Sequence, residues 1–476
     1  MRTGLLVALL LGVLIGALAN AILAPALGAM SVDLGVTPDR LTLAFSVYAV
    51  VYAAVVPLLG RLGDVLGYKP VFAFSAGLFA LGSLLAGAAG SLATLVAARA
   101  VQAAGAGGLF PVAQAVAGAM LTGHERSKAL GMIMAAFALG SVLGPNLGGF
   151  LVEHLSWRWV FWVSVPLGVL ALALVLPQRL PTPGKRETID WLGGILVAGT
   201  LAALVMGIQG LEQIDQVGFF SGPIAGRFAL ALLGGGLLYL WERRQREPVL
   251  DMELALGRAF LPIWWVSILL GYALMGGLVF APLYAQVTFL FTAFQSGLIL
   301  NALALAMVAA SGFAGATAQR LGARRLTLWG MALVALGLGA MTFLGSALAG
   351  LLAGLGLVGL GIGLAQPPLS HLALGLAPAG KEGQVSGLAS LTRSLGVAAG
   401  ITISGVLLAR RSRELAELGG GFGAMDPTAS LKDAPVFVQE MLKHTLGRGI
   451  QEGWEVAFVA ALLGLVAAFL IRPDPR

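Results

Sequence analysis

The chain contains 476 residues, of which 58% are hydrophobic and only 11% are charged, and its mean hydropathy is +0.92. Soluble domains carry about 25% charged residues, so this composition excludes a soluble globular protein. The sequence has no cysteine, which excludes disulfide bonds, thiol chemistry and cysteine metal sites. We therefore expect an all-α polytopic membrane protein.

Long apolar runs recur along the chain, each near the ~20 residues that cross ~30 Å of hydrocarbon. They predict fourteen transmembrane helices, at about 4–28, 42–62, 70–90, 91–120, 127–152, 158–178, 189–209, 224–242, 261–285, 294–316, 324–345, 347–376, 383–409 and 453–472. The 68 glycines suit helices in a bilayer, where close backbone contact replaces the hydrophobic force between helices. The polar stretch 410–452 is expected to be a flexible outer loop.

The distribution of positive charge predicts the orientation of the chain in the membrane. With a cytoplasmic N-terminus, most Lys and Arg residues lie on the cytoplasmic side; the short outer loops hold only Arg40 and Arg158, with Arg227 at a helix edge. This asymmetry follows the positive-inside rule, so we expect both termini in the cytoplasm. It also accounts for the net charge of +7 without a nucleic-acid partner. The preference for Arg over Lys indicates a bacterial source and hence the bacterial cytoplasmic (inner) membrane.

A glycine-rich charged segment, residues 60–69, separates the second and third apolar runs. Its glycines suit a sharp turn and close packing, and Asp64 lies between two cations of the segment. A carboxylate at this place can pair with those cations and face the positive N-terminus of another helix, which contributes ~0.3–2 kcal/mol. We expect a conformational latch formed by Gly60, Asp64, Gly67 and Lys69. The alternative is an ordinary solvated loop charge.

A second segment, residues 315–325, repeats this layout of small residues, a basic residue, Leu-Gly and further basic residues, but it lacks the acid. Both copies are expected on the cytoplasmic side. Two copies that face the same side indicate two similar halves related by an axis along the membrane normal. That arrangement is typical of secondary transporters.

Three glycines of the fifth apolar run, Gly140, Gly144 and Gly148, recur every four residues and therefore share one helix face. Gly149 follows them, and Pro145 removes one backbone hydrogen bond and can bend the helix. Two interpretations remain open. The glycines serve generic packing between helices, or they serve a moving interface between the halves, where tight contact limits proton leak.

Arg99 and Arg393 are the only cations well inside the predicted spans. Charged side chains at that depth are costly and usually face a cavity or a partner, although each arginine could instead be a structural hydrogen-bond hub. Gln102 lies about one turn from Arg99 and is expected on the same face. Further buried polar side chains that could line a substrate cavity or take part in coupling are Asn20, Asn146, Tyr272 and Asn301.

Several of these segments resemble those of the major facilitator superfamily. Residues 60–69 are similar to its loop signature, residues 99–105 to a fourth-helix motif with a buried arginine, and residues 140–149 to a fifth-helix motif of its antiporters. Similarity to the fourteen-helix drug:proton antiporter family in particular comes from residues 156–161, 190–193 and 393–396.

The resemblance implies two six-helix bundles, at 1–180 and 259–476, with two extra helices and a linker inserted at 181–258. It also implies alternating access around a central cavity. Within that mechanism, Asp64 would act on the conformation of the protein and not on the substrate.

The chain departs from the family pattern in its acidic residues. Members that export cationic drugs commonly carry an acid in the first helix, and alignment on Pro25 puts Gly16 at that place. None of the 22 acidic residues falls deep inside a predicted span, although a membrane-embedded carboxylate is the natural proton carrier and the natural counter-ion for a cation. A cavity with two arginines and no acid would favour neutral or anionic amphiphiles. Glu153, Glu455 and Asp64 remain candidates for proton coupling.

The leading hypothesis is therefore a proton-coupled exporter of amphiphilic, drug-like small molecules, acting as a monomer in the lipid bilayer without a metal or cofactor. One alternative is an exporter or flippase of anionic or lipid-like amphiphiles. Another, of a different class, is a non-transporting membrane sensor or scaffold. An enzyme is disfavoured, because the sequence shows no nucleophile–base pair, metal cluster or phosphate-binding loop.

Overall fold

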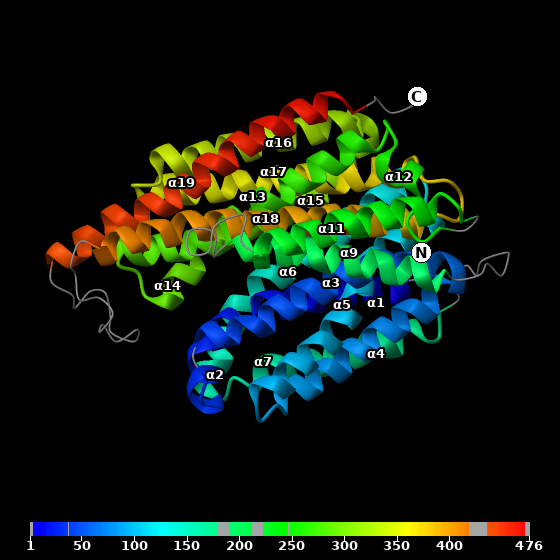
Figure 1. The fold of residues 1–476 in the computed structure, drawn as a ribbon. Coiled ribbons are helices and arrows are strands. Elements are labelled where there is room, and N and C mark those ends of the chain that lie inside the picture. Colours follow the sequence, from blue (N-terminus) through cyan, green and yellow to red (C-terminus); the bar gives the residue numbers. More distant parts are fainter. Residues whose placement is uncertain are drawn as a thin grey trace.

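The computed structural model of the protein describes residues 3–36, 38–178, 180, 190–211, 222–245, 248–417 and 436–471. Within these residues all regular structure is helical, as expected (Figure 1). The helices are α1 (Thr3–Ala21), η1 (Ala24–Ala26), α2 (Leu27–Leu34), α3 (Pro38–Leu66), α4 (Tyr68–Gly87), α5 (Leu92–Met120), α6 (Gly123–His154), α7 (Trp159–Trp162), α8 (Ser164–Val175), α9 (Trp191–Gly210), α11 (Gly222–Glu242), α12 (Met252–Leu256), α13 (Leu261–Phe289), α14 (Ala293–Leu298), α15 (Leu300–Leu321), α16 (Ala323–Leu344), α17 (Leu348–Gly375), α18 (Glu382–Glu417) and α19 (Val436–Phe469).

Twelve of the described helical segments are long and apolar enough to cross a membrane. Two shorter apolar stretches, Gly4–Ala19 and Trp159–Val175, stand at the places of the first and sixth predicted spans. The described helices therefore follow the fourteen predicted positions, and twelve of them have the length of a span on their own.

The first predicted span, 4–28, is not one continuous helix. α1 ends at Ala21, and the short elements η1 and α2 follow it. Pro25 lies within η1. Proline has no N–H group and restricts the residue before it, so Pro25 disfavours a regular α-helix at this point. α1 still has 19 residues, which extend about 28 Å at ~1.5 Å per residue.

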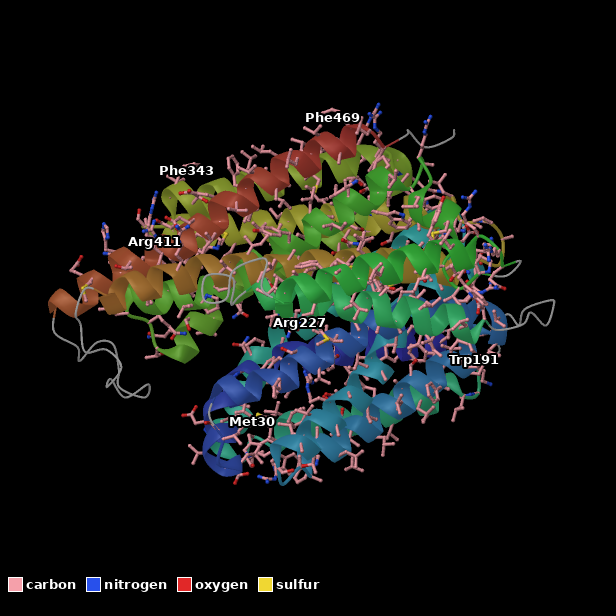
Figure 2. The ribbon with its side chains drawn as sticks, in the orientation of Figure 1. Met30, Trp191, Arg227, Phe343, Arg411 and Phe469 are labelled. Carbon is pink, nitrogen blue, oxygen red and sulfur yellow. The ribbon has the colours of Figure 1, made fainter. Side chains whose placement is uncertain are left out.

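The predicted outer loop at 410–452 is helical at both of its ends. α18 continues to Glu417 and α19 already begins at Val436, so these helices have 36 and 34 residues. They extend beyond the other helices at the left of Figure 1, and Arg411 is labelled there in Figure 2. Arg411 Nε donates to Glu452 Oε2 at 3.2 Å and so ties the two extensions together. The loop expectation was wrong for the two helical parts; residues 418–435 lie outside the described part of the chain.

The helices form two groups with a third pair beside them. α1 to α8 pack among themselves, with close pairs such as α4 with α5 and α1 with α6, and α13 to α19 do the same. The two groups meet where α3 and α5 pack on α18, and where α6 packs on α15 and α17. The pair α9 and α11, drawn in green, contacts both groups, because α9 packs on α3 and on α18 (Figure 1).

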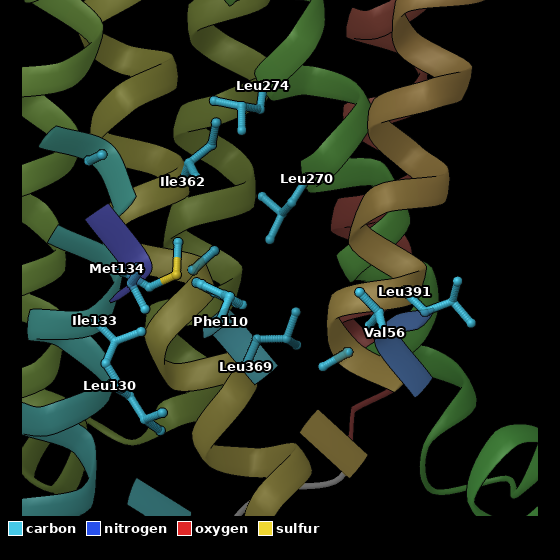
Figure 3. Packing of buried hydrophobic residues seen from close by; sticks show 14 of the residues in the cluster. Val56, Phe110, Leu130, Ile133, Met134, Leu270, Leu274, Ile362, Leu369 and Leu391 are labelled. Atoms are coloured by element: carbon cyan, nitrogen blue, oxygen red, sulfur yellow. The ribbon is translucent and has the colours of Figure 1, made fainter. Parts of the chain in front are cut away.

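A continuous hydrophobic cluster crosses the boundary between the two groups (Figure 3). Val56, Phe110 and Met134 come from the helices before α9, whereas Leu270 and Leu391 come from the helices after α11. All of these side chains are buried in one cluster. We call the two groups the N-terminal and C-terminal halves, and we call the end of the bundle where α3 ends and α18 begins the Asp64 end.

Candidate functional site

Asp64 lies near the end of α3, against the N-terminus of α18. Its carboxylate accepts the backbone N–H groups of Gly383 and Gln384, at 2.7 and 2.8 Å, and the hydroxyl of Tyr68 at 2.8 Å. α18 begins at Glu382, so both amides belong to its first turn, where N–H groups have no partner inside the helix. The helix dipole adds an attraction for negative charge at this place. Asp64 is only 8% exposed, so it is not a solvated loop charge in this conformation.

Gly60 and Gly383 bring the backbones of α3 and α18 together beside Asp64. A Cβ atom on either glycine would overlap the carbonyl oxygen of the other. Gly67, between α3 and α4, has a φ of 95°, which side chains rarely adopt. Lys69 is half-buried, and no ion pair joins it to another residue of the described ranges. We use the name latch contact for Gly60, Asp64, Gly383 and Gln384.

Two further polar contacts join the halves. Gln114 Nε2 on α5 donates to Ser370 Oγ on α17 at 3.2 Å, and both side chains are buried. Ser127 Oγ, in the first turns of α6, lies 3.1 Å from His371 Nδ1 on α17. Successive helices run in opposite directions, so the start of α6 and the end of α17 both lie at the Asp64 end. These two contacts and the latch contact therefore close the same end of the bundle.

Asn146 and Asn301, two of the predicted cavity residues, meet between α6 and α15. Asn146 Nδ2 on α6 donates to Asn301 Oδ1 on α15 at 3.4 Å, and both side chains are half-buried. Asn146 also donates to the carbonyl oxygen of Val142. The structure therefore brings these two amides together across the boundary between the halves.

The glycines of the antiporter-like segment pack within the N-terminal half. A Cβ atom on Gly140 would overlap the Leu14 carbonyl oxygen of α1, one on Gly148 would overlap the carbonyl oxygen of Ile22 directly after α1, and one on Gly144 would lie 2.6 Å from the Ala21 Cβ atom. Pro145 is half-buried, and a Cβ atom on Gly149 would meet nothing within 4 Å. These glycines thus serve close packing of α6 on α1.

The interpretation that places those glycines at the interface between the halves does not hold for this conformation. The close glycine contact between α6 and the C-terminal half is made elsewhere, by Gly131. A Cβ atom on Gly131 would lie 3.0 Å from the Gly315 Cα atom and 2.6 Å from the Ser311 carbonyl oxygen. Gly315 belongs to the segment that echoes residues 60–69, so the repeat contributes to this contact through its glycine.

Arg99 on α5 is completely buried and held entirely by the N-terminal half. Its Nη1 donates to Gln102 Oε1 at 2.6 Å, and its Nε donates to the Ala44 carbonyl oxygen at 3.4 Å. The guanidinium carbon lies 4.0 Å from the centre of the Tyr48 ring, and Gln102 Nε2 continues the network to Ser83 Oγ at 2.8 Å. Arg99 Nη2 has no hydrogen-bond partner among the described residues. Gln102 lies on the same face of α5 as Arg99, as expected, and its side chain also hydrogen-bonds to the guanidinium.

Arg393 on α18 reaches from the C-terminal half into the N-terminal half. Its guanidinium carbon lies 4.5 Å from the ring centre of Phe110 on α5 and 4.6 Å from that of Phe137 on α6. It also lies close enough to the hydroxyl of Tyr52 on α3 to interact with it. Arg393 is 6% exposed, and its Nε has no hydrogen-bond partner among the described residues. Three helices of one half thus enclose a cation that belongs to the other half; we call this group the aromatic cage.

The backbone of Arg393 is fixed by close packing of α18 on α13. A Cβ atom on Gly271 would overlap the Arg393 carbonyl oxygen, and one on Gly400 would lie 2.8 Å from the Tyr272 carbonyl oxygen. Tyr272 is buried, and its hydroxyl has no hydrogen-bond partner in the described ranges. The side chain of Asn20, another predicted cavity residue, lies outside the described part of the chain.

Described ion pairs lie away from these buried arginines. Lys381 Nζ contacts Asp251 Oδ2 at 2.5 Å, and Arg158 Nη1 contacts Asp33 Oδ2 at 2.6 Å. Over the described ranges, no ion pair joins Arg99 or Arg393 to an acid, and no group of His, Asp and Glu residues is arranged to hold a metal ion. The positive charge in the bundle interior is therefore balanced by aromatic faces, amides and backbone carbonyls in the part of the chain described.

Sequence reasoning does not identify Phe110 and Phe137 as partners of Arg393. Aromatic side chains occur throughout the apolar runs, and nothing in their spacing distinguishes these two from residues that face lipid. The chain order hides the relationship further, because α18 is distant in the sequence from α5 and α6 and meets them only in the folded bundle.

A two-half helical bundle with a charged contact at one end and buried arginines inside is the architecture of a membrane transporter. The sequence model of the Major Facilitator Superfamily matches residues 9–401, and the chain belongs to this superfamily. It is thus a polytopic membrane transport protein of a family whose members are transporters and not enzymes.

Three known proteins illustrate the range of relatives. The chain is 30% identical over 420 residues to the multidrug transporter protein MdtP of Bacillus subtilis, which covers 87% of this chain and 76% of the relative. It is 33% identical over 415 residues to a triacylglyceride transporter of Mycolicibacterium hassiacum, covering 82% and 76%. The crystal structure of the human organic anion transporter MFSD10 shares the fold with a TM-score of 0.68, at 18% identity and with 99% and 100% of the two chains covered.

Proposed function

We propose that the protein is a secondary active transporter of the drug:proton antiporter type, which exports amphiphilic small molecules by alternating access. The observation that carries this proposal is the latch contact. It joins the N-terminal half to the C-terminal half through one carboxylate, two backbone amides and a glycine pair. These are non-covalent contacts at one end of the bundle, so they can break when the halves rock apart.

The expected orientation of the chain in the membrane indicates which side the described conformation is closed to. With the Asp64 end in the cytoplasm, the conformation described here is closed toward the cytoplasm. Opening of this end would release Asp64 from the first turn of α18 and admit a substrate from the cytoplasm or the inner leaflet. We assign Asp64 a conformational role, since it lies at the end of α3 and its oxygens are occupied by α18 and Tyr68.

The drug-like substrate class is supported by the relatives and by the bundle interior. Multidrug transporter relatives are about 30% identical to this chain. Phe110, Phe137 and Tyr52 bring large apolar surfaces to the boundary between the halves, as a binding region for amphiphiles requires. We place the protein in a bacterial cytoplasmic membrane as a monomer with both termini inside, and divide it at 1–180, 181–258 and 259–476.

Transport in liposomes tests the proposal. Purified protein is reconstituted and a pH gradient is imposed, and uptake or release of cationic dyes, neutral amphiphiles and anionic amphiphiles is followed together with internal pH. We expect movement of at least one amphiphile that accelerates with the gradient and is accompanied by counter-movement of protons. Substrate movement that is indifferent to the gradient would overturn the proton coupling, and movement of none would favour the sensor or scaffold alternative.

A second candidate substrate class is favoured by Arg393. Its guanidinium lies at the boundary of the halves without an ion-paired acid among the described residues, and an unpaired buried cation attracts an anion. We therefore propose anionic or lipid-like amphiphiles as the alternative cargo. The names of a triacylglyceride transporter and an organic anion transporter among the similar proteins agree with this alternative. Proton release on addition of a cationic drug would contradict it.

A further inference from the structure

The helix pair α9 and α11, inserted between the two halves, is joined at the Asp64 end by partly buried polar contacts. Asp190 caps α9, because its Oδ1 accepts the backbone N–H of Gly193 at 2.8 Å. Its other oxygen, Oδ2, accepts Trp241 Nε1, in the last turn of α11, at 2.8 Å. One carboxylate therefore fixes the start of α9 to the end of α11.

Glu242, the last residue of α11, continues this connection into the linker. The side chain is 3% exposed, and its Oε1 accepts the backbone N–H of Leu250 at 3.2 Å. It also lies close enough to Arg61, in the latch segment of α3, for electrostatic attraction. Residues 248–251 of the linker are thereby held against the inserted pair.

The same linker residues are bound by the first turn of α18. Gln384 Nε2 donates to the carbonyl oxygens of Pro248 and Val249, at 2.7 and 3.3 Å. Lys381, directly before α18, contacts Asp251 Oδ2 at 2.5 Å. Both contacts are at least partly buried, where hydrogen bonds are stronger than in water.

Gln384 therefore has two partners in different parts of the molecule. Its backbone N–H donates to Asp64 in the N-terminal half, while its side chain donates to the linker of the inserted pair. When the Asp64 end opens, the first turn of α18 must move away from Asp64. The linker must then either move together with this turn or lose its hydrogen bonds to Gln384. Either course makes the opening depend on α9, α11 and the linker.

We propose that α9, α11 and residues 248–251 form a brace that positions the first turn of α18 for Asp64. Gln384, Glu242 and Trp241 are the positioning residues of this brace. The inserted helices accordingly set how often the Asp64 end opens, without touching the substrate. This inference rests on the alternating-access cycle proposed above, and it assigns the inserted pair a role in that cycle.

The test measures opening directly. The chain has no cysteine, so spin labels can be attached to cysteines introduced at chosen positions without removing native ones. Leu66 and Leu376 are exposed positions of opposite halves near the Asp64 end, at 50% and 45% exposure. Distance distributions between labels at these positions, recorded in lipid nanodiscs by pulsed electron spin resonance, give the ratio of open to closed molecules.

The decisive variant is Gln384→Met, which keeps the size of the side chain and removes its donor but leaves the backbone N–H on Asp64. Loss of one or two hydrogen bonds should raise the open-to-closed ratio by about three- to tenfold. Trp241→Phe, which removes the donor to Asp190, should change the ratio in the same direction. Gln451→Met is the matched control, because Gln451 Nε2 donates to the Tyr284 hydroxyl within the C-terminal half; it should leave the ratio unchanged.

An unchanged ratio in both Gln384→Met and Trp241→Phe would overturn the brace. Asp64→Asn, measured in the same way, reports on the latch contact alone. If Asp64→Asn opens this end and the brace variants do not, the brace is wrong and the latch stands. If the brace variants open it and Asp64→Asn does not, the latch assignment fails, while control of the opening by the inserted pair stands.

Discussion

The backbone N–H of Gln384 donates to the Asp64 carboxylate at 2.8 Å, although 320 positions separate the two residues in the sequence. This hydrogen bond exists only while the end of α3 and the start of α18 are in contact. Since α3 belongs to one half and α18 to the other, its presence or absence distinguishes a closed Asp64 end from an open one.

Substitution of Gly383 should keep the Asp64 end from closing. In Gly383→Ala, the added methyl group would overlap the Gly60 carbonyl oxygen and approach Asp64 Oδ1 at 2.6 Å, so the two backbones must separate. We expect the open-to-closed ratio to rise at least tenfold and transport to fall by a similar factor. Gly375→Ala is the matched control, because a methyl group there meets nothing within 4 Å. Equal behaviour of the two variants in spin-label distances would contradict the close contact.

Substitution of Arg393 should separate anionic from neutral cargo. Arg393→Gln removes the charge in the aromatic cage, so the apparent affinity for a carboxylate amphiphile should fall about tenfold, which is 1.4 kcal/mol. The affinity for the methyl ester of the same molecule should change less than about twofold, and Arg393→Lys should retain part of the preference. Binding is measured by fluorescence titration of purified protein. Arg227→Gln is the control, because Arg227 lies on α11 and donates to the Met206 carbonyl oxygen. Equal losses for acid and ester would contradict an anion-binding role.

The antiporter-like segment offers a matched pair of neighbouring glycine positions. Gly144→Ala places a methyl group 2.6 Å from the Ala21 Cβ atom, so α6 and α1 must move apart, at a cost of about 1–3 kcal/mol. Gly149→Ala meets no atom within 4 Å and should be neutral or slightly stabilising. Thermal unfolding in detergent measures both. A normal melting temperature for Gly144→Ala would show that this glycine is not needed for packing on α1.

Asp33 provides a pH prediction outside the membrane spans. Hydrogen bonds from Arg158, at 2.6 Å, and from Trp157, at 3.0 Å, hold the pKa of Asp33 below its usual 3.8. A lowered pKa means that the contact contributes stability above the usual pKa and loses it as the pH falls through the lowered value. The difference in melting temperature between the unchanged protein and Asp33→Asn should therefore stay constant from pH 7 to pH 5 and shrink only below 3.8. A difference that fades between pH 7 and pH 5 would contradict this assignment.

Much of the fold is predictable from the sequence, because few structures can satisfy the hydrogen-bonding groups of the backbone inside a bilayer. Each long apolar run must become a helix, so the helix positions follow from run lengths. The failures have local causes. The first run is divided into α1, η1 and α2 around Pro25. The charged residues within 410–417 and 436–452 are helical, since α18 and α19 extend beyond a span there and are tied by Arg411 and Glu452.

The site is predictable only where one segment carries the signal. Residues 60–69 are recognisable by themselves, and Arg99 with Gln102 share a helix face, so both emerge from sequence spacing. The identity of the helix that meets Asp64 depends on tertiary packing, so it cannot be predicted from sequence spacing. The glycines near Gly144 show the limit most clearly, because spacing indicates that they share a face but not whether α1 or the other half lies against it.

The central claim is that Asp64 holds the two halves together at one end and thereby controls transport. The most direct measurement compares Asp64→Asn with the unchanged protein in two assays, substrate binding and spin-label distances between positions 66 and 376. The account predicts that binding affinity stays within about twofold, while the open-to-closed ratio rises at least tenfold and turnover in liposomes drops. Loss of binding with an unchanged distance distribution would contradict it, because Asp64 would then act on the substrate and not on the conformation.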